Sequence, residues 1–144
     1  MPQFHATCVA IDGLGVLIRG PSGSGKSDLA LRLIDAGARL VADDRCDVEA
    51  EDGRPMARAP GTIHGLLEAR GIGILRLETL AEAPVGLVID LEPADEIGRL
   101  PEPTMADIAG IPVSAIRLDG LAASAPAKVR LAVAMARGEV EIAT

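Results

Sequence analysis

The sequence predicts an α/β fold. Strand-length runs of Val, Ile, Leu and Ala alternate with two segments whose apolar residues recur at helical spacing. A glycine-rich loop joins one strand candidate to the first helical segment. The hydrophobic share of 49% beside 24% charged residues is typical of a globular protein, and 144 residues is the size of one domain. We therefore expect residues 1–144 to form a single folding unit.

The N-terminal third predicts two strands and a helix. Residues 4–11 are largely β-formers, and after the turn at Asp12-Gly13 the apolar residues 15–18 lead into Gly20. Residues 27–36 have helical periodicity and end before a glycine stop signal. The residues on the apolar face of this helix are Leu29, Ala30, Leu33 and Ile34.

The middle of the chain predicts further strands. Residues 39–42 predict a parallel strand, and Asp52-Gly53 within residues 48–59 is a strong hairpin signal. Residues 66–71 predict a short helix or loop, after which residues 72–75 resume β character. These elements would extend a sheet that begins with the N-terminal strands.

The C-terminal part predicts two strands, a loop and a second helix. Residues 86–91 and 111–118 are apolar strand candidates. Residues 92–104 are rich in Pro and acidic residues, as a surface loop would be. Ser124 followed by Pro126 is typical of a helix start.

Composition and charge exclude several classes of function. A net charge of -7 and a pI near 4.8 would repel a polyanionic backbone, so we expect no nucleic-acid partner. No apolar run approaches the roughly 20 residues of a membrane span, and the start lacks signal-peptide character. We therefore expect a cytoplasmic protein without a membrane partner. Cys8 and Cys46 are too few for a disulfide framework and predict small buried thiols.

The strongest motif is a full match to the glycine-rich phosphate loop, between a predicted strand and a predicted helix. Glycines let backbone N–H groups surround phosphate oxygens, and the helix N-terminus adds partial positive charge. Lys26 can reach the β- and γ-phosphates of ATP, and the Ser27 hydroxyl can complete the coordination of Mg²⁺. The motif consists of Gly20, Pro21, Ser22, Gly23, Ser24, Gly25, Lys26 and Ser27.

Acidic residues and a histidine supply the other candidates. Asp43 and Asp44 follow a predicted strand, where α/β sheets place ligands, so one could bind Mg²⁺ while the other accepts a proton. A solvated turn or a helix cap is the alternative for this pair. For Glu68 and its neighbour Arg70, a surface pair is the more common explanation, and a lone histidine such as His5 is more often structural than catalytic.

Two stretches of the sequence resemble the catalytic domain of the HPr serine kinase/phosphorylase family. The first is residues 13–44, which contain GVLI, the phosphate loop, SDLAL and RLVADD in the family's order. The second is residues 66–74, LLEARGIGI, which is similar to the family's signature segment. The likeness covers residues 5–91. It implies a phosphoenolpyruvate carboxykinase-like mixed sheet with flanking helices and a single catalytic domain over residues 1–144.

The resemblance also implies roles. A member of this family transfers the γ-phosphoryl group of ATP to a serine of the phosphocarrier protein HPr of the phosphotransferase system, assembles as a hexamer, and catalyses the reverse phosphorolysis. By match to the motifs, Asp44 would accept the proton and Lys26 would hold the transferring phosphate. Ser27, Glu68 and Asp43 would serve Mg²⁺. His5 matches the active-site histidine, and Arg99 matches a functional arginine downstream.

Two departures from the family pattern give further expectations. Full-length members carry an additional N-terminal domain, so this chain resembles a short form. The segment that the family uses for dephosphorylation is matched poorly by residues 111–117, which predicts weak or absent phosphorylase activity. The alternatives are a small-molecule kinase and a regulatory module that senses ATP without transferring phosphate. The presence of Asp44 favours transfer over sensing.

Overall fold

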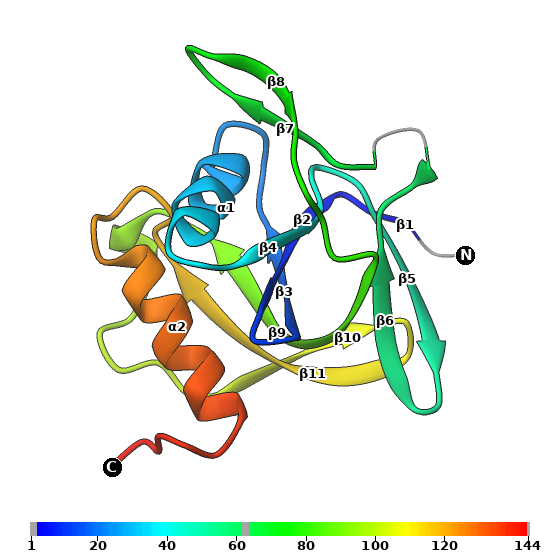
Figure 1. Ribbon diagram of the computed structural model, residues 1–144. Helices are drawn as coiled ribbons and strands as arrows, with labels where there is room; N and C mark the ends of the chain where they lie inside the picture. The colour runs from blue at the N-terminus through cyan, green and yellow to red at the C-terminus, as the bar shows by residue number, and fades with distance from the viewer. Residues whose placement is uncertain (1–2, 62–63, 144) are drawn as a thin grey trace.

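The computed structural model describes residues 3–61 and 64–143. Its strands, helices and one 3-10 turn follow the chain in the order shown in Figure 1. They are β1 Gln3–Phe4, β2 Ala6–Ile11, β3 Leu14–Arg19, α1 Lys26–Asp35, β4 Arg39–Ala42, β5 Cys46–Glu51, β6 Arg54–Arg58, β7 Leu66–Ala69, β8 Gly73–Arg76, β9 Glu82–Leu91, η2 Ala94–Glu96, β10 Thr104–Ile108, β11 Ile111–Leu118 and α2 Ala125–Ala136.

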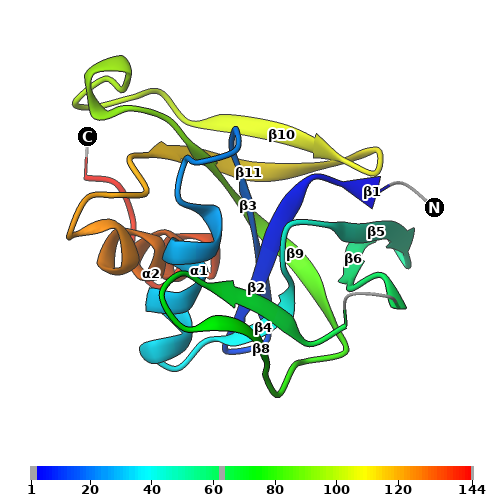
Figure 2. The same cartoon turned by 90° about the horizontal axis from the view of Figure 1, so that it is seen from above.

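A 9-stranded mixed sheet forms the centre of the molecule, with the path β1-β5-β6-β9-β3-β2-β4. The long strand β9 pairs with β3 along one edge, and its other edge pairs first with β6 and then with β11. Strand β10 lies outside β11. Because the path divides at β9, the sheet curls, and Figure 2 shows β10 and β11 turning away from β5 and β6. This architecture confirms the predicted α/β class.

The curled sheet is apolar on both faces. Val16 and Ile18 of β3 pack with α1 and α2, which lie side by side over one face. Leu17, between them in sequence, points to the opposite face and packs with Val48 of β5 and Ile108 of β10. A strand covered on both faces has a continuous apolar run, which explains the unbroken run in the sequence of β3.

Strand β4 runs antiparallel to its neighbour β2, so the prediction of a parallel strand at residues 39–42 is wrong. The chain leaves β3, crosses through α1, and passes β2 before β4 joins the sheet. Strands β3 and β4 therefore point the same way, with β2 between them in the opposite direction. The last residues of β3 and β4 therefore lie beside the first residues of β2, at the same end of the sheet.

The structure contains the predicted hairpin and one that was not predicted. The Asp52-Gly53 turn joins β5 to β6 with positive φ at both residues, as predicted. Residues 66–69, expected as a short helix or loop, instead form β7, which pairs with β8 in a separate hairpin. Gly71 and Gly73 have φ values of 91 and 137, so the turn between the strands forms without strain. Burial of Leu67 against α1 also favours the strand over local helix propensity.

The C-terminal elements largely follow the prediction. Residues 92–103 form an exposed loop that contains η2, and α2 begins at Ala125 with proline in its first turn. Strand β10 was not predicted, although Ala106 and Ile108 alternate with exposed residues. Within the described ranges, no helix is long and apolar enough to cross a membrane.

Candidate active site

The glycine-rich loop connects the end of β3 to the first turn of α1, as the motif requires. Gly23 and Gly25 have φ values of 83 and 98, which favour glycine. A Cβ atom on Gly20 would lie 2.5 Å from the Ser24 hydroxyl oxygen, so this position also excludes side chains. The loop therefore has the backbone freedom and close approach that a phosphate cradle needs.

Lys26 is folded back over this loop. Lys26 is only 7% exposed to solvent. Its ammonium group donates hydrogen bonds to the carbonyl oxygens of Gly20 at 2.8 Å and Pro21 at 3.3 Å. A buried ammonium must have partners, and here the loop's own carbonyls provide them. The charge is thus held at the mouth of the loop, where phosphate oxygens would bind.

Three hydroxyl and carboxyl groups meet where β2, β4 and α1 converge. Ser27 Oγ donates to Asp43 Oδ1 at 2.7 Å, and Thr7 Oγ1 donates to the same oxygen at 2.9 Å. Asp43 directly follows β4, and Ser27 lies in the first turn of α1. The structure therefore brings the predicted metal-binding residues Ser27 and Asp43 together.

Asp44 points to the other side, toward His5. The two side chains meet at 2.9 Å between Nε2 and Oδ1, and they are 66% and 59% exposed. A contact this open to solvent contributes less than about 1 kcal/mol to stability. A shallow pocket of about 420 Å³ opens beside it, lined by Gln3, Phe4, His5, Asp44 and Arg45.

The donor set suits Mg²⁺ and a polyphosphate. Mg²⁺ prefers oxygen ligands and is held in phosphate-loop enzymes by a loop hydroxyl and a strand-end aspartate, the pair formed here by Ser27 and Asp43. The Ser24 hydroxyl is buried without a hydrogen-bond partner among the described residues. A buried orphan of this kind is expected where polar groups are arranged for a ligand.

Glu68 and Arg99 are not part of this cluster. The hairpin of β7 and β8 projects from the rest of the molecule (Figure 1). Glu68 of β7 is exposed and pairs with Ile74 of β8. Within residues 3–61 and 64–143, no three His, Cys, Asp or Glu side chains lie close enough to hold a metal ion. Arg99 is exposed in the loop before β10. Neither residue has been brought to Asp43 or Asp44.

Two arginines connect the loop to its surroundings. Arg19 at the end of β3 pairs with Asp90 at the end of β9 through two hydrogen bonds of 2.8 and 3.1 Å. Arg32 of α1 donates to the carbonyls of Gly120 and Ala122, which holds the turn after β11 against the loop. These contacts fix the strand ends and the helix from which the site is built.

Sequence reasoning missed Thr7 and the pocket residue Arg45. Thr7 is fully buried, with 0% exposure, in an apolar strand. A threonine there is an ordinary β-former, so residue type alone gives no signal. Arg45 follows Asp44 directly and lines the same pocket. The sequence shows that Arg45 follows two aspartates, but it does not show the direction of the Arg45 side chain.

Comparison with known proteins identifies relatives of this chain. The model of the family described as HPr Serine kinase C-terminal domain matches residues 1–129. A protein of Clostridium tetani named HPr kinase/phosphorylase is 36% identical over 134 residues, covering 81% of this chain and 42% of the relative. One of the same name from a Geobacillus species is 47% identical over 96 residues, covering 61% and 31%. This chain therefore spans less than half the length of these relatives.

A solved structure gives the same result at the level of the fold. The structure described as the Hpr(Ser) kinase/phosphatase from Coxiella burnetii superimposes with a TM-score of 0.85 at 29% identity. The match covers 96% of this chain and 98% of that one. The curled mixed sheet with two helices is therefore the fold of that protein.

Proposed function

Because the chain belongs to the HPr serine kinase C-terminal domain family, we propose that it transfers the γ-phosphoryl group of ATP to a serine of HPr, the phosphocarrier protein of the phosphotransferase system. The observation that carries the proposal is the meeting of a phosphate loop, the Ser27–Asp43 contact and the Asp44–His5 pair at one edge of the sheet. We also propose that residues 1–144 act as one catalytic unit in the cytoplasm.

In this proposal the loop and Lys26 bind the phosphates. The Lys26 ammonium now bonded to Gly20 and Pro21 would exchange one carbonyl for phosphate oxygens with little movement. Ser27 and Asp43 would hold Mg²⁺, which when bound neutralises charge that develops on the transferred group. The helix N-terminus beneath the loop adds partial positive charge.

Asp44 is the proposed proton acceptor. Its carboxylate is 59% exposed beside an open pocket, so the hydroxyl of a protein substrate can reach it. In the transfer step, the serine oxygen forms a bond to the γ-phosphorus of ATP, and the bond between this phosphorus and the oxygen that leaves with ADP breaks. The serine proton moves to Asp44. His5 orients the Asp44 carboxylate through the contact at 2.9 Å.

Glu68 and Arg99 complete the proposed site. Glu68 would bring a third oxygen ligand to Mg²⁺, and Arg99 would approach the acceptor side. Both lie on segments that project from the sheet, a hairpin and a long loop. Such segments can close over substrates, and their residues then act only in the complex.

The proposal also covers the reverse reaction and assembly. Residues 111–117, the poor match to the family's dephosphorylation segment, lie within β11 and pair with β9 and β10. The support for weak or absent phosphorylase activity is the poor sequence match of this segment. We further propose a homo-oligomer, in line with the hexamer of the family resemblance.

The test is transfer of ³²P from γ-labelled ATP with Mg²⁺ to HPr of the same organism. HPr with its acceptor serine replaced by alanine is the matched control. Labelling of the intact acceptor alone supports the proposal, and release of pyrophosphate from phospho-HPr with added phosphate would overturn the prediction of weak phosphorylase activity. Tight ATP binding without any labelling would point instead to a small-molecule kinase or an ATP-sensing module.

A further inference from the structure

The segments that carry His5 and Asp44 face each other between two short ladders. Phe4 pairs with Cys46 on one side, and Cys8 pairs with Ala42 on the other. The same number of residues separates these pairs on each strand, so a continuous antiparallel register would have been available. The chain does not form it, because Asp44 has a φ of 66.

Asp44 lies at the centre of a strained three-residue turn. The Arg45 N–H donates to the Asp43 carbonyl at 2.7 Å across a residue with positive φ, the pattern of the rarer and more strained type of γ-turn. A non-glycine residue in this conformation persists only when its surroundings hold it. The turn removes the Asp44 N–H from the ladder, so this amide needs another acceptor.

Thr7 supplies that acceptor. Its Oγ1 accepts from the Asp44 N–H at 3.1 Å and donates to Asp43 Oδ1 at 2.9 Å. The side chain is completely buried. One hydroxyl thus satisfies the backbone of one aspartate and the carboxylate of the other, which requires a group that donates and accepts at once.

We propose that Thr7 is a positioning residue that holds the strained turn and thereby sets the directions of both aspartates. The proposal rests on the proposed function, in which Asp43 serves the metal and Asp44 the proton. Without the hydroxyl, the Asp44 amide loses its partner and Asp43 Oδ1 keeps only Ser27. The turn would then relax toward the register that the flanking ladders favour, and Asp44 would move away from His5.

An alternative is that Thr7 only fills space in β2. Two substitutions separate the roles of shape and hydroxyl. Thr7→Val keeps the branched shape and removes both hydrogen bonds, whereas Thr7→Ser keeps the hydroxyl and removes a methyl group. If Thr7 acts by packing, Thr7→Ser should lower activity more than Thr7→Val. If Thr7 acts by positioning, Thr7→Val should lower activity more.

The experiment measures steady-state transfer to HPr by the intact chain. We expect Thr7→Val to lower kcat about 100-fold, since a displacement on the order of 1 Å can have this effect, with the KM for ATP nearly unchanged. Thr7→Ser should retain most of the activity. Val9→Ala, at a fully buried position on the same strand, is the control for general destabilisation and should keep its kcat. A kcat of Thr7→Val equal to that of the wild type, or equal losses in Val and Ser, would overturn the proposal.

A second measurement does not depend on the substrate. Hydrogen exchange of the Asp44 amide, followed by NMR, should be about tenfold faster in Thr7→Val and nearly unchanged in Thr7→Ser, because only the first loses the acceptor. If the wild type does not phosphorylate HPr, the proposed function fails while this comparison still decides the role of Thr7. Equal exchange rates in the wild type and Thr7→Val would refute it.

Discussion

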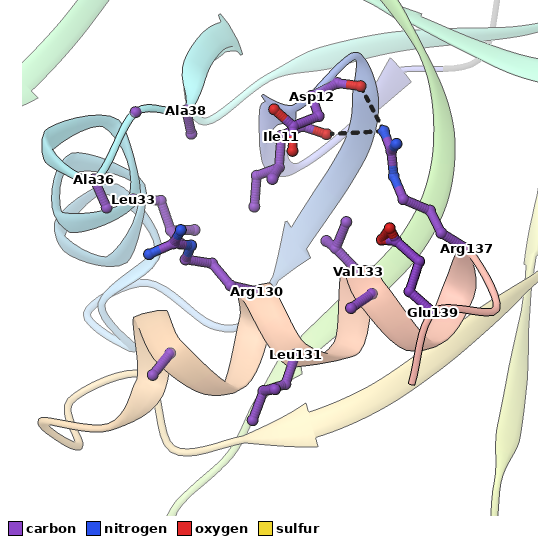
Figure 3. Close-up of a pocket in the computed structure, with 13 residues that line it drawn as sticks. Ile11, Asp12, Leu33, Ala36, Ala38, Arg130, Leu131, Val133, Arg137 and Glu139 are labelled. Carbon is purple, nitrogen blue, oxygen red and sulfur yellow. Dashed lines mark hydrogen bonds between the residues drawn. The ribbon is translucent and has the colours of Figure 1, made fainter. Parts of the chain in front are cut away.

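The two ends of β2 and β3 differ in how their polar groups are used. At one end, side chains from β2, α1 and the segment after β4 meet around Asp43 and Asp44. At the other, the Asp12-Gly13 turn faces a larger hollow of about 640 Å³ between α1 and α2 (Figure 3). Arg137 donates there to the carbonyls of Ile11 and Asp12, and the lining is mostly apolar.

This difference teaches that size is a poor guide to the site in this protein. In the larger hollow, Arg137 is hydrogen-bonded to a turn, whereas the smaller pocket is lined by His5 and by Asp44, whose backbone is strained. Strained residues and convergent polar groups are features of functional sites. The following experiments test whether the two ends are as different as their chemistry suggests.

The largest expected effect is at Asp44. Asp44→Asn keeps the shape of the side chain but removes the proton acceptor, so we expect kcat for transfer to HPr to fall by about 10³-fold. Affinity for ATP, measured by calorimetry, should remain close to that of the wild type. Full activity in this variant would show that Asp44 is not the acceptor, and loss of ATP binding would assign it a structural or metal-directed role.

A smaller but broader effect is expected at Lys26. Lys26→Met removes the charge held over the loop, so we expect weaker ATP binding together with a fall in kcat of about 10²-fold. Lys128 of α2 provides the matched control, since Lys128→Met removes the same charge from an exposed position outside the loop motif. Equal losses in the two variants would mean that net charge, and not the cradle, is responsible.

The two cysteines behind the proposed site should be closed to thiol reagents. A hydrogen bond with the Cys46 thiol, and after it burial, raises the pKa of Cys8 well above its ordinary value. Both thiols are fully buried, so access of a reagent to them is blocked. We expect iodoacetamide at pH 8 to label neither cysteine in the folded protein and both in urea, as read by mass spectrometry. Rapid labelling of the native chain would show that the edge opens readily.

The smallest effect is expected at the far end. Arg137→Ala removes the hydrogen bonds to the turn between β2 and β3, so we expect a loss of about 1 kcal/mol in the free energy of unfolding. Transfer to HPr should be unchanged. Arg130→Ala is the control, because Arg130 lines the same hollow without a hydrogen bond to another described residue. A strong loss of activity in Arg137→Ala would remove the contrast between the ends.

Local patterns predicted the elements well but not their partners. The helix after the phosphate loop and the Asp52-Gly53 hairpin follow from signals within a few residues. The direction of β4 does not, because it depends on β2 lying between β4 and β3. The strand at residues 66–69 also depends on distant contacts, since α1 covers Leu67.

The site shows the same limit. The phosphate loop and the pair Asp43-Asp44 could be proposed as site residues because each consists of consecutive residues in the sequence. Thr7 could not, since its role arises from the register between β2 and the segment after β4. The roles of all the site residues remain predictions, and Glu68 and Arg99 also lie on projecting segments apart from the aspartates.

The matched spacing between the two short ladders has a consequence for sequence change in this family. The pairs Phe4–Cys46 and Cys8–Ala42 fix the register of the two segments on both sides of the His5–Asp44 contact. Inserting or deleting one residue in either segment would shift one ladder against the other and turn its side chains to the opposite face. Substitutions there can change the chemistry one side chain at a time. A change in length would disturb both the His5–Asp44 contact and the core, so we expect this part of the chain to tolerate exchange of residues but not insertion or deletion.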